Sequence, residues 1–481
     1  MSKTQPATRA SIGRGMRGLP ILLAGQAMAS MDASILVVAA PSLRADLHAG
    51  EAQLQLVVVM YTLVFAALVV TGARLGDVLT PRRAFLLGLG AFSGASLIGG
   101  LAPDPTTLIV ARGAQGAAGA LMTPQVLTII QRHYVDPRRR ARALGAYSLI
   151  LAVGVAAGQV IGGLLVSAHL LDAAWRPALL LNAPVGAALL VAARRGLPAA
   201  PAPAAAAPRL DRAGAAILAA AMLALVLPLT LGRDAGWPAW TPPALVAAAL
   251  ALAAFVVHER RAPSPLFDLS LLRAPAVAAG ALAVLLIMGA YAGFLLCLTL
   301  RLQDGLGFTP LQAGLVFAVY AAGFATASLT WTRLPAALAL RLPALGPLLM
   351  AVGVLVAAGR EPGAPMLAAL LVGGAGHAFG FAPLSQRLAA AVSPHQTADL
   401  SGLLLTASLI GSVLGTTAIG GVYLGAASGT ASGAALSRTA PVIAAVLLAT
   451  AAAACVRPRR PRIAAAPAAT CPPHHQPARA R

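Results

Sequence analysis

The sequence predicts an all-helical protein that crosses a membrane many times. Apolar residues make up 59% of its 481 residues and charged residues only 10%, with a mean hydropathy of +0.82. Soluble domains are less apolar than this. The apolar residues also fall into runs of about 17 to 25 residues, the length that crosses the hydrocarbon core as a helix.

Fourteen such runs can be placed along the chain. The weakest are 344–359, which is short and follows Pro343, and 213–232, which contains Pro228; neighbouring helices can satisfy the backbone groups that a proline frees. The runs are 19–40, 53–73, 84–102, 106–130, 143–168, 176–193, 213–232, 241–258, 276–300, 311–332, 344–359, 364–386, 399–424 and 437–456.

Alternate loops differ in their content of basic residues. Of 35 Lys and Arg residues, 28 fall in the termini and every second loop, six fall on the other side, and Arg112 lies inside a run. Because cytoplasmic loops collect Lys and Arg, we expect an even number of spans in the cytoplasmic membrane, with both termini in the cytoplasm.

A stretch rich in proline and alanine, Pro198–Pro208, divides the runs into groups. Such a segment is a semi-rigid linker, and the polar, basic C-terminal stretch is typical of disorder. We therefore predict a 6+2+6 arrangement: a cytoplasmic N-terminus (1–18), a six-helix bundle (19–195), a linker (196–212), an inserted helix pair (213–258), a second six-helix bundle (259–456) and a disordered basic cytoplasmic tail (457–481).

The composition excludes several classes of function. The basic excess lies in loops between spans, where it sets orientation and does not indicate nucleic-acid binding. The single lysine, Lys3, excludes a P-loop, and the three scattered cysteines indicate neither a disulfide framework nor a zinc site. We expect no metal and no cofactor. The preference for Ala and Arg over Lys indicates a bacterial genome of high GC content.

Two charged residues stand inside apolar runs, Asp32 in 19–40 and Arg112 in 106–130. A charge near the centre of a membrane helix costs roughly 2.5–3.5 kcal/mol, so such residues usually serve an ion or substrate pathway. The two runs should be antiparallel, with Asp32 about 14 Å and Arg112 about 9 Å below the same membrane face. Pairing is therefore possible; a purely structural ion pair, or a residue that snorkels to the interface, is the alternative.

Three runs carry recognisable motifs. Met31–Pro41 is similar to Asp-x-Thr-(Ile/Val)-Val-Asn-Val-Ala-Leu-Pro, with Val37 in place of the asparagine. Leu108–Gly119 matches Arg-x-x-Gln-Gly-x-Gly closely. Gly154–Gly163 follows Gly-x-x-x-Gly-Pro-x-x-Gly-Gly, with Gln159 in place of the proline.

Further motifs lie in loops and at run ends. The loop Gly72–Arg83 is similar to Gly-x-Leu-Ala-Asp-Arg-x-Gly-Arg-Lys, although Ala73 and Thr80 occupy glycine positions. Shorter matches are Trp175-Arg176, Asn182–Gly186, Leu302-Gln303, Gly307–Pro310 and Ala313-Gly314.

With these motifs in order, residues 19–456 resemble the major facilitator superfamily, and within it the fourteen-helix drug:proton antiporters (the EmrB/QacA-like exporters). The resemblance implies two bundles related by a pseudo-two-fold axis, which rock about a midplane site. It implies proton-coupled efflux of lipophilic drugs or antibiotics, as in multidrug or self-resistance.

The resemblance also implies roles for two groups of residues. The antiporter motif, which would act as a pivot and seal, comprises Gly154, Gly158, Gln159, Gly162 and Gly163; ordinary helix packing is the alternative. A latch at the cytoplasmic face would comprise Asp77, Arg82 and Arg83; a plain positive-inside loop is the alternative.

We predict that proton coupling rests on Asp32, Arg112 and Gln115. Burial favours the neutral form of a carboxyl group and a nearby arginine favours its ionised form. Movement of Arg112 relative to Asp32 would therefore switch Asp32 between proton uptake and release. A cationic substrate would compete with the proton for the ionised carboxylate.

Polar and aromatic residues within the spans are candidates for a substrate cavity, which is usually apolar with a few polar groups. They are Gln26, Gln125, Tyr147, Tyr291, Tyr320 and His377, each of which could equally serve helix packing. Acidic residues of the last six spans lie only at the edges, at Asp304, Glu361 and Asp399. We therefore expect a neutral or monocationic lipophilic substrate, carried by a monomer.

Two other functions stay open, and a third is disfavoured. A proton-linked importer of a small metabolite would share the fold, because fold does not fix direction. A non-transporting sensor would not need both Asp32 and Arg112. An intramembrane enzyme is disfavoured because neither His-Glu-x-x-His nor Gly-x-Ser-x-Gly occurs.

Overall fold

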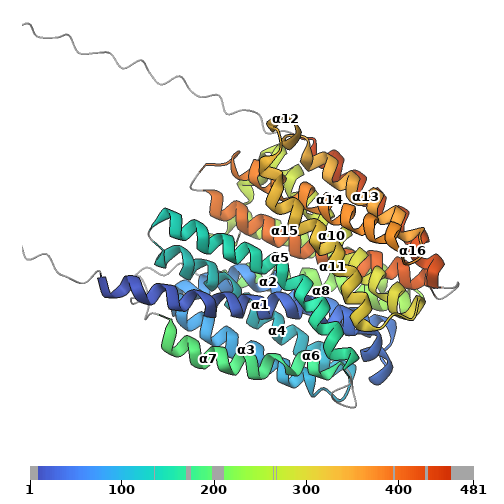
Figure 1. The fold of residues 1–481 in the computed structure, drawn as a ribbon, viewed down its shortest axis with the longest axis horizontal. Coiled ribbons are helices and arrows are strands. Elements are labelled where there is room, and N and C mark those ends of the chain that lie inside the picture. The colour runs from blue at the N-terminus through green and yellow to red at the C-terminus, as the bar shows by residue number, and fades with distance from the viewer. Residues whose placement is uncertain are drawn as a thin grey trace, which may run out of the picture.

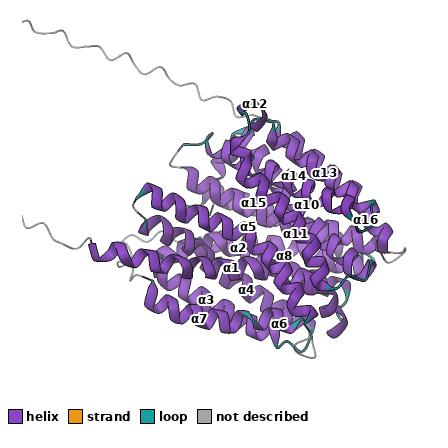
Figure 2. Ribbon diagram, in the orientation of Figure 1, coloured by secondary structure: helices purple, strands orange, loops and turns teal. Residues whose placement is uncertain are grey.

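The computed structural model describes residues 9–134, 136–168, 175–197, 211–263, 265–266, 268–393, 396–427 and 432–456. Within these ranges the chain consists of helices and connecting loops (Figure 2). Most of the predicted linker, 198–210, and the whole predicted tail, 457–481, lie outside the described residues, as does 1–8.

Helices of the first part of the chain begin with a longer helix than predicted. The first starts at Arg9 and not at residue 19, so the described part of the expected N-terminal segment continues the first span. The helices are α1 (Arg9–Asp46), α2 (Glu51–Leu79), α3 (Pro81–Gly100), α4 (Pro105–His133), α5 (Pro137–Ser167), α6 (Arg176–Leu180) and α7 (Asn182–Gly196).

The predicted sixth run, 176–193, is split between α6 and α7. Pro184 explains the break, because it has no N–H to donate to the carbonyl of Leu180 one turn earlier. Asn182 thereby becomes the first residue of α7.

Two helices follow the undescribed linker, α8 (Arg212–Asp234) and α9 (Thr241–Arg261). The remaining elements are η1 (Leu269–Arg273), α10 (Pro275–Leu300), η2 (Arg301–Gly305), α11 (Pro310–Thr330), η3 (Trp331–Arg333), α12 (Ala336–Ala339), α13 (Leu342–Ala358), α14 (Ala364–Ala389), α15 (Thr397–Ala427) and α16 (Ser432–Ala454).

By length and composition, eleven helices of the described residues could cross a membrane. They correspond to eleven of the fourteen predicted runs. The other three runs fall on the shorter apolar helices Val153–Ser167 and Leu342–Ala358 and on α4, which carries Arg112.

The helices form two groups that repeat one contact pattern. In the first, α1 packs on α5 and α7, α2 on α4, and α3 on α4 and α7; in the second, α10 packs on α15 and α16, α11 on α14, and α13 on α14 and α16. In each group, leaving out the short helices α6 and α12, the first helix therefore packs on the fifth and sixth, the second on the fourth, and the third on the fourth and sixth. In Figure 1 the first group is coloured blue to green and the second yellow to red.

The two groups meet through α5 with α11 and α2 with α15, while α8 packs on α2, α9 and α15. They touch closely near the ends of α1, α5 and α10. There Gln303 donates to the carbonyl of Val38 at 2.9 Å, and the backbone N–H of Leu311 donates to Ser167 Oγ at 3.2 Å. We call this junction the closed end.

Candidate functional site

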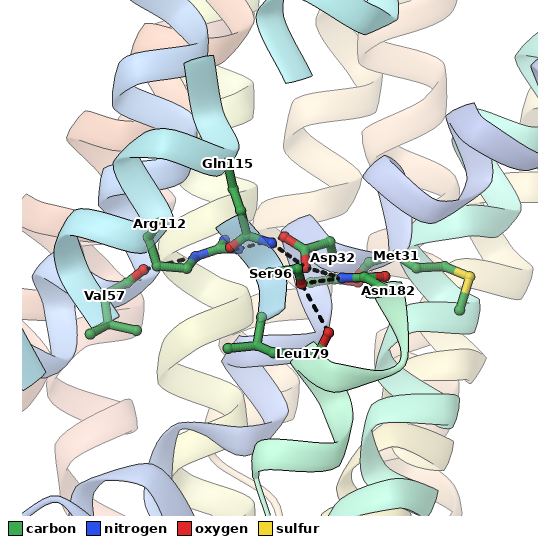
Figure 3. Close-up of polar contacts among 9 residues, drawn as sticks. Met31, Asp32, Val57, Ser96, Arg112, Gln115, Leu179 and Asn182 are labelled. Carbon is green, nitrogen blue, oxygen red and sulfur yellow. Dashed lines mark hydrogen bonds and ion pairs between the residues drawn. The ribbon is translucent and has the colours of Figure 1, made fainter. Parts of the chain in front are cut away.

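A buried polar cluster surrounds Asp32 in the middle of α1 (Figure 3). The Asp32 side chain accepts hydrogen bonds from three residues of two other helices: Arg112 and Gln115 of α4 and Asn182 of α7. Asp32 is 1% exposed, as is Arg112. The predicted pairing of the two intramembrane charges is present.

Arg112 holds the cluster together. Its Nη1 lies 2.5 Å from Asp32 Oδ2 and 2.9 Å from Gln115 Oε1, while its Nε donates to the carbonyl of Val57 at 3.4 Å. Gln115 lies three residues further along α4, so both side chains emerge from one helix face. Gln115 in turn donates from Nε2 to Asp32 Oδ1 at 3.1 Å.

Tyr61 covers the other side of Arg112. The guanidinium carbon lies 4.7 Å from the centre of the Tyr61 ring, a cation–π arrangement that is strongest when it is dry. Gly116 permits this contact, because a Cβ there would lie 2.4 Å from the backbone oxygen of Tyr61. The glycine of the Arg-x-x-Gln-Gly motif thus brings α2 against α4.

Asn182 and Ser96 complete the cluster and were not among the predicted site residues. Asn182 Nδ2 lies 2.7 Å from Asp32 Oδ1 and 2.9 Å from Ser96 Oγ, and Ser96 donates to the carbonyl of Leu179 at 2.9 Å. A signal existed for Asn182, since it lies in a motif and is a lone amide in an apolar run. Ser96 carries no comparable signal, because serine is common in membrane helices.

The antiporter motif packs α5 against α1. A Cβ at Gly154 would lie 2.6 Å from Ser30 Cβ, at Gly158 2.2 Å from Ser34 Oγ, and at Gly162 2.6 Å from Ile35 Cγ1. Gly163 faces the second group instead, 2.5 Å from the carbonyl oxygen of Pro310 by the same measure. Small residues are what such close helix contacts require.

Gln159 sits where α1, α5 and α11 meet. Its Nε2 donates to the carbonyl of Ser34 at 3.2 Å, and its backbone oxygen would lie 2.5 Å from a Cβ at Gly314 of α11. Ser34 Oγ donates in return to the carbonyl of Val155 at 2.8 Å. Two reciprocal hydrogen bonds therefore tie α1 to α5.

Two adjoining cavities lie between the helix groups. The first, of about 310 Å³, is lined by α1, α2, α4, α5, α10 and α15, and includes Gln26, Ser34 and Tyr147. The second, of about 350 Å³, is lined by α5, α10, α11 and α14. Leu151, Val155 and Tyr291 line both.

Five of the six predicted cavity residues line these cavities: Gln26 and Tyr147 the first, Tyr320 and His377 the second, and Tyr291 both. Gln125 does not. It is fully buried between α2 and α4, where its Nε2 donates to the carbonyl of Gly72 at 2.9 Å. In this position the amide satisfies a helix carbonyl, as a buried amide can in place of a ligand.

Both cavities are uncharged: no Asp, Glu, Lys or Arg is among the described residues that line them. Asp32 lines neither, because the cavity face of α1 carries Gln26, Ser30 and Ser34 while Asp32 faces α4 and α7. The expected direct competition of substrate and proton for this carboxylate is therefore not supported by the geometry.

The charges of the α2–α3 loop differ in pairing from the expected latch. Asp77 forms an ion pair with Arg132 of α4, with 2.7 Å between Asp77 Oδ1 and Arg132 Nη2. Arg82 donates to the carbonyl of Arg194 at 2.6 Å, and the Arg83 side chain is exposed. The acidic residue of the motif thus joins α2 to α4, and Arg82 joins α3 to α7.

Comparisons with known proteins agree with this architecture. The sequence profile described as Major Facilitator Superfamily matches residues 22–416. The chain is 34% identical over 424 residues to the "Probable actinorhodin transporter" of Streptomyces coelicolor, covering 86% of this chain and 73% of that protein. It is 32% identical over 431 residues to the "Puromycin resistance protein pur8" of Streptomyces alboniger, covering 85% and 82%.

Among solved structures, a bacterial homologue of the human lysosomal transporter Spinster, inward-facing and unoccupied, aligns with a TM-score of 0.63 at 19% identity over 94% of this chain and 95% of that one. At this identity the likeness concerns the fold alone. The profile match and the relatives above 30% identity confirm the predicted family: the chain belongs to the major facilitator superfamily of membrane transporters.

Proposed function

We propose that this chain exports small lipophilic antibiotics or other drugs across the cytoplasmic membrane in exchange for protons. Its relatives include the actinorhodin transporter and the puromycin resistance protein named above. The observation that carries the proton-coupled form of the proposal is the buried Asp32–Arg112 pair beside an uncharged central cavity.

The proposed architecture is fourteen spans in a 6+2+6 arrangement. It is supported by the contact pattern that repeats between α1–α7 and α10–α16, with α8 and α9 outside that pattern. The positive-inside rule then puts both termini in the cytoplasm. With that orientation the closed end faces away from the cytoplasm. We also propose that the protein works as a monomer.

Asp32 would carry the proton, with Arg112 and Gln115 setting its charge state. The Asp32 carboxylate accepts hydrogen bonds from Arg112, Gln115 and Asn182, and Arg112 supplies its counter-charge in this conformation. If α4 shifts and takes Arg112 away, the buried carboxylate loses its counter-charge and takes up a proton, because an unpaired buried charge is costly.

The coupling to substrate would run through α1. Asp32 and the cavity residues Ser30 and Ser34 lie on opposite sides of this helix, and the motif glycines bring α5 into close contact with α1 on the side of Ser30 and Ser34. Asp77, Arg132 and Arg82 would act as the cytoplasmic latch, by tying α2 to α4 and α3 to α7 in this conformation.

The test is drug-triggered proton movement in everted vesicles that hold a pH gradient, screened over neutral and monocationic lipophiles. Asp32→Asn should abolish the response. The matched control is Asp104→Asn, since asparagine also caps helices. Hydrogen bonds from the Thr107 side chain and backbone hold the pKa of Asp104 below its usual value, so this half-buried residue stays ionised at neutral pH.

The proposal fails if Asp32→Asn exports drugs as the wild type does and still moves protons. Substrate accumulation by intact cells would indicate import instead, and the absence of any transported compound would favour a sensor.

A further inference from the structure

The second cavity has an unusual lining. Phe, Tyr and Trp make up 4% of the chain, yet five of the eleven residues that line this cavity are Phe or Tyr, and a sixth is His377. The rings are Tyr291, Phe317, Tyr320, Phe324, His377 and Phe381.

These rings already contact one another. The Tyr291 ring lies 4.7 Å from that of His377 and 5.8 Å from that of Tyr320, to which it is nearly parallel at 22°. The Phe324 ring lies 4.9 Å from that of His377. Aromatic faces and edges at such spacings are what a flat ring system packs against.

A glycine-rich stretch places His377 in this lining. A Cβ at Gly374 would lie 2.0 Å from the backbone oxygen of Tyr320, and one at Gly376 2.5 Å from the backbone nitrogen of Met350. The two glycines bring α14 against α11 and α13. His377 is thereby held beside Tyr320, with 3.1 Å between its Nδ1 and the Tyr320 hydroxyl.

His377 has one polar atom left over. Its side chain is 3% exposed, and Nε2 is buried with no hydrogen-bond partner among the described residues. The Tyr320 hydroxyl lies 3.1 Å from Nδ1 and 3.9 Å from Met350 Sδ, and a thioether sulfur is the weaker acceptor. Donation to Nδ1 places the hydrogen of the neutral ring on Nε2, which is then a donor without an acceptor. A buried donor without a partner is costly, so a ligand oxygen there would be favoured.

We infer that the second cavity binds flat, uncharged aromatic ring systems that carry a carbonyl oxygen, with His377 Nε2 as the hydrogen-bond donor. The inference rests on the proposed function, whose substrate class it narrows. The volume of 350 Å³ lies within the range of small-molecule sites. An aromatic cage also attracts cations, but no carboxylate among the described lining residues balances a positive charge.

The experiment uses the full chain in lipid nanodiscs and three fluorescent probes of one shape: acridone, which is neutral and has a carbonyl; anthracene, which has none; and N-methylacridinium, which is cationic. His377→Phe should weaken acridone binding about fivefold to tenfold, the value of one hydrogen bond, and leave anthracene binding unchanged. His377→Gln, which restores a donor, should recover much of the loss.

Two variants test the contribution of the aromatic rings that line the second cavity. Phe324→Leu and Phe381→Leu should each weaken acridone and anthracene alike, about threefold. Phe308→Leu is the control, because Phe308 is also half-buried but lies outside both cavities.

The inference is overturned if acridone binds equally well to His377→Phe, or if N-methylacridinium binds tightest and ignores both ring variants. A loss shared by Phe308→Leu would also count against it. Asp32-dependent export of another compound without acridone binding would overturn this inference alone. No Asp32-dependent export of any compound would overturn the proposed function.

Discussion

Asp32 and Ser34 lie two residues apart on α1 and contact different partners. Ser34 lines the first cavity and donates to the carbonyl of Val155 on α5, whereas Asp32 is bound by Arg112 of α4 and Asn182 of α7. A change in the charge of Asp32 therefore acts on α1 from the side away from the cavity. An effect on a substrate in the first cavity would be transmitted by movement of α1 or through Tyr61, which lines that cavity and stacks on Arg112.

Arg112→Gln, compared with a double variant, should separate the effect of the ion pair on protein stability from its effect on proton coupling. It leaves the buried Asp32 charge without its partner, at a cost of about 3–5 kcal/mol in the free energy of unfolding. The double variant Asp32→Asn/Arg112→Gln removes both charges and should recover most of that loss, while drug-triggered proton movement stays absent. Denaturant unfolding in detergent and the vesicle assay measure the two quantities. Recovered transport in the double variant would show that the pair is only structural.

Gly158→Ala should disrupt the contact of α5 with α1. The new Cβ would lie 2.2 Å from Ser34 Oγ and 2.4 Å from the carbonyl oxygen of Met31, and overpacking of this kind costs about 1–3 kcal/mol. Gly145→Ala on the same helix is the control, since nothing lies within 4 Å of its Cβ position. Export and thermal stability should fall for the first variant only; equal effects would contradict the packing role.

Gln159→Pro should be tolerated better than a proline elsewhere in α5. A proline inside a helix removes an N–H and costs about 3 kcal/mol or more. A proline at position 159 would remove the helical hydrogen bond to the carbonyl of Val155. Ser34 Oγ already donates to that carbonyl, so it would keep a partner. Ala157→Pro provides the comparison, and the two free energies of unfolding decide. The argument is wrong if both prolines destabilise α5 equally.

Thr80→Gly should stabilise the protein. Thr80 joins α2 to α3 with a φ of +85° and a ψ of +139°, a conformation that strongly favours glycine. Its hydroxyl accepts from the N–H of Arg83 at 3.4 Å, but replacing a cap by glycine costs only a few tenths of a kcal/mol. We expect a gain of about 1 kcal/mol in denaturant unfolding; a net loss would mean that the cap outweighs the strain.

Arg132→Ala should reproduce the transport defect of Asp77→Ala, because these two residues form the ion pair. Arg83→Ala, an exposed arginine of the motif, should export as the wild type does. Stability should change little, since exposed pairs contribute about 0–1 kcal/mol. The exchange Asp77→Arg/Arg132→Asp should restore export, measured in vesicles. If Arg83→Ala alone is defective, Arg83 and not Arg132 acts in the latch.

Thr80 and Arg132 show what the sequence could and could not predict. The loop motif marked Thr80 as standing at a glycine position, and its backbone has the conformation that glycine favours. Arg132 lies 55 residues from Asp77 along the chain, and its pairing depends on how α2 and α4 lie side by side. Local pattern carries no information on such a contact when many arginines border the same membrane face.

The same distinction separates the members of the Asp32 cluster. The energetic cost of a charge in lipid and the similar membrane depth of Asp32 and Arg112 indicated that these two residues could pair. Asn182 and Ser96 are neutral, so their burial in an apolar run costs less and stands out less. The helix ranges followed from apolar run length, whereas the break between α6 and α7 depended on one proline.

The uncharged cavity has a consequence for the energy source of transport. If Asp32 carries one proton inward for each neutral molecule carried outward, every cycle moves one net positive charge into the cell. The exchange would then be electrogenic, and the membrane voltage would drive it together with the pH difference. A potential of about 100 mV adds about 2.3 kcal/mol per cycle, which corresponds to roughly fiftyfold in the substrate gradient that the protein can sustain.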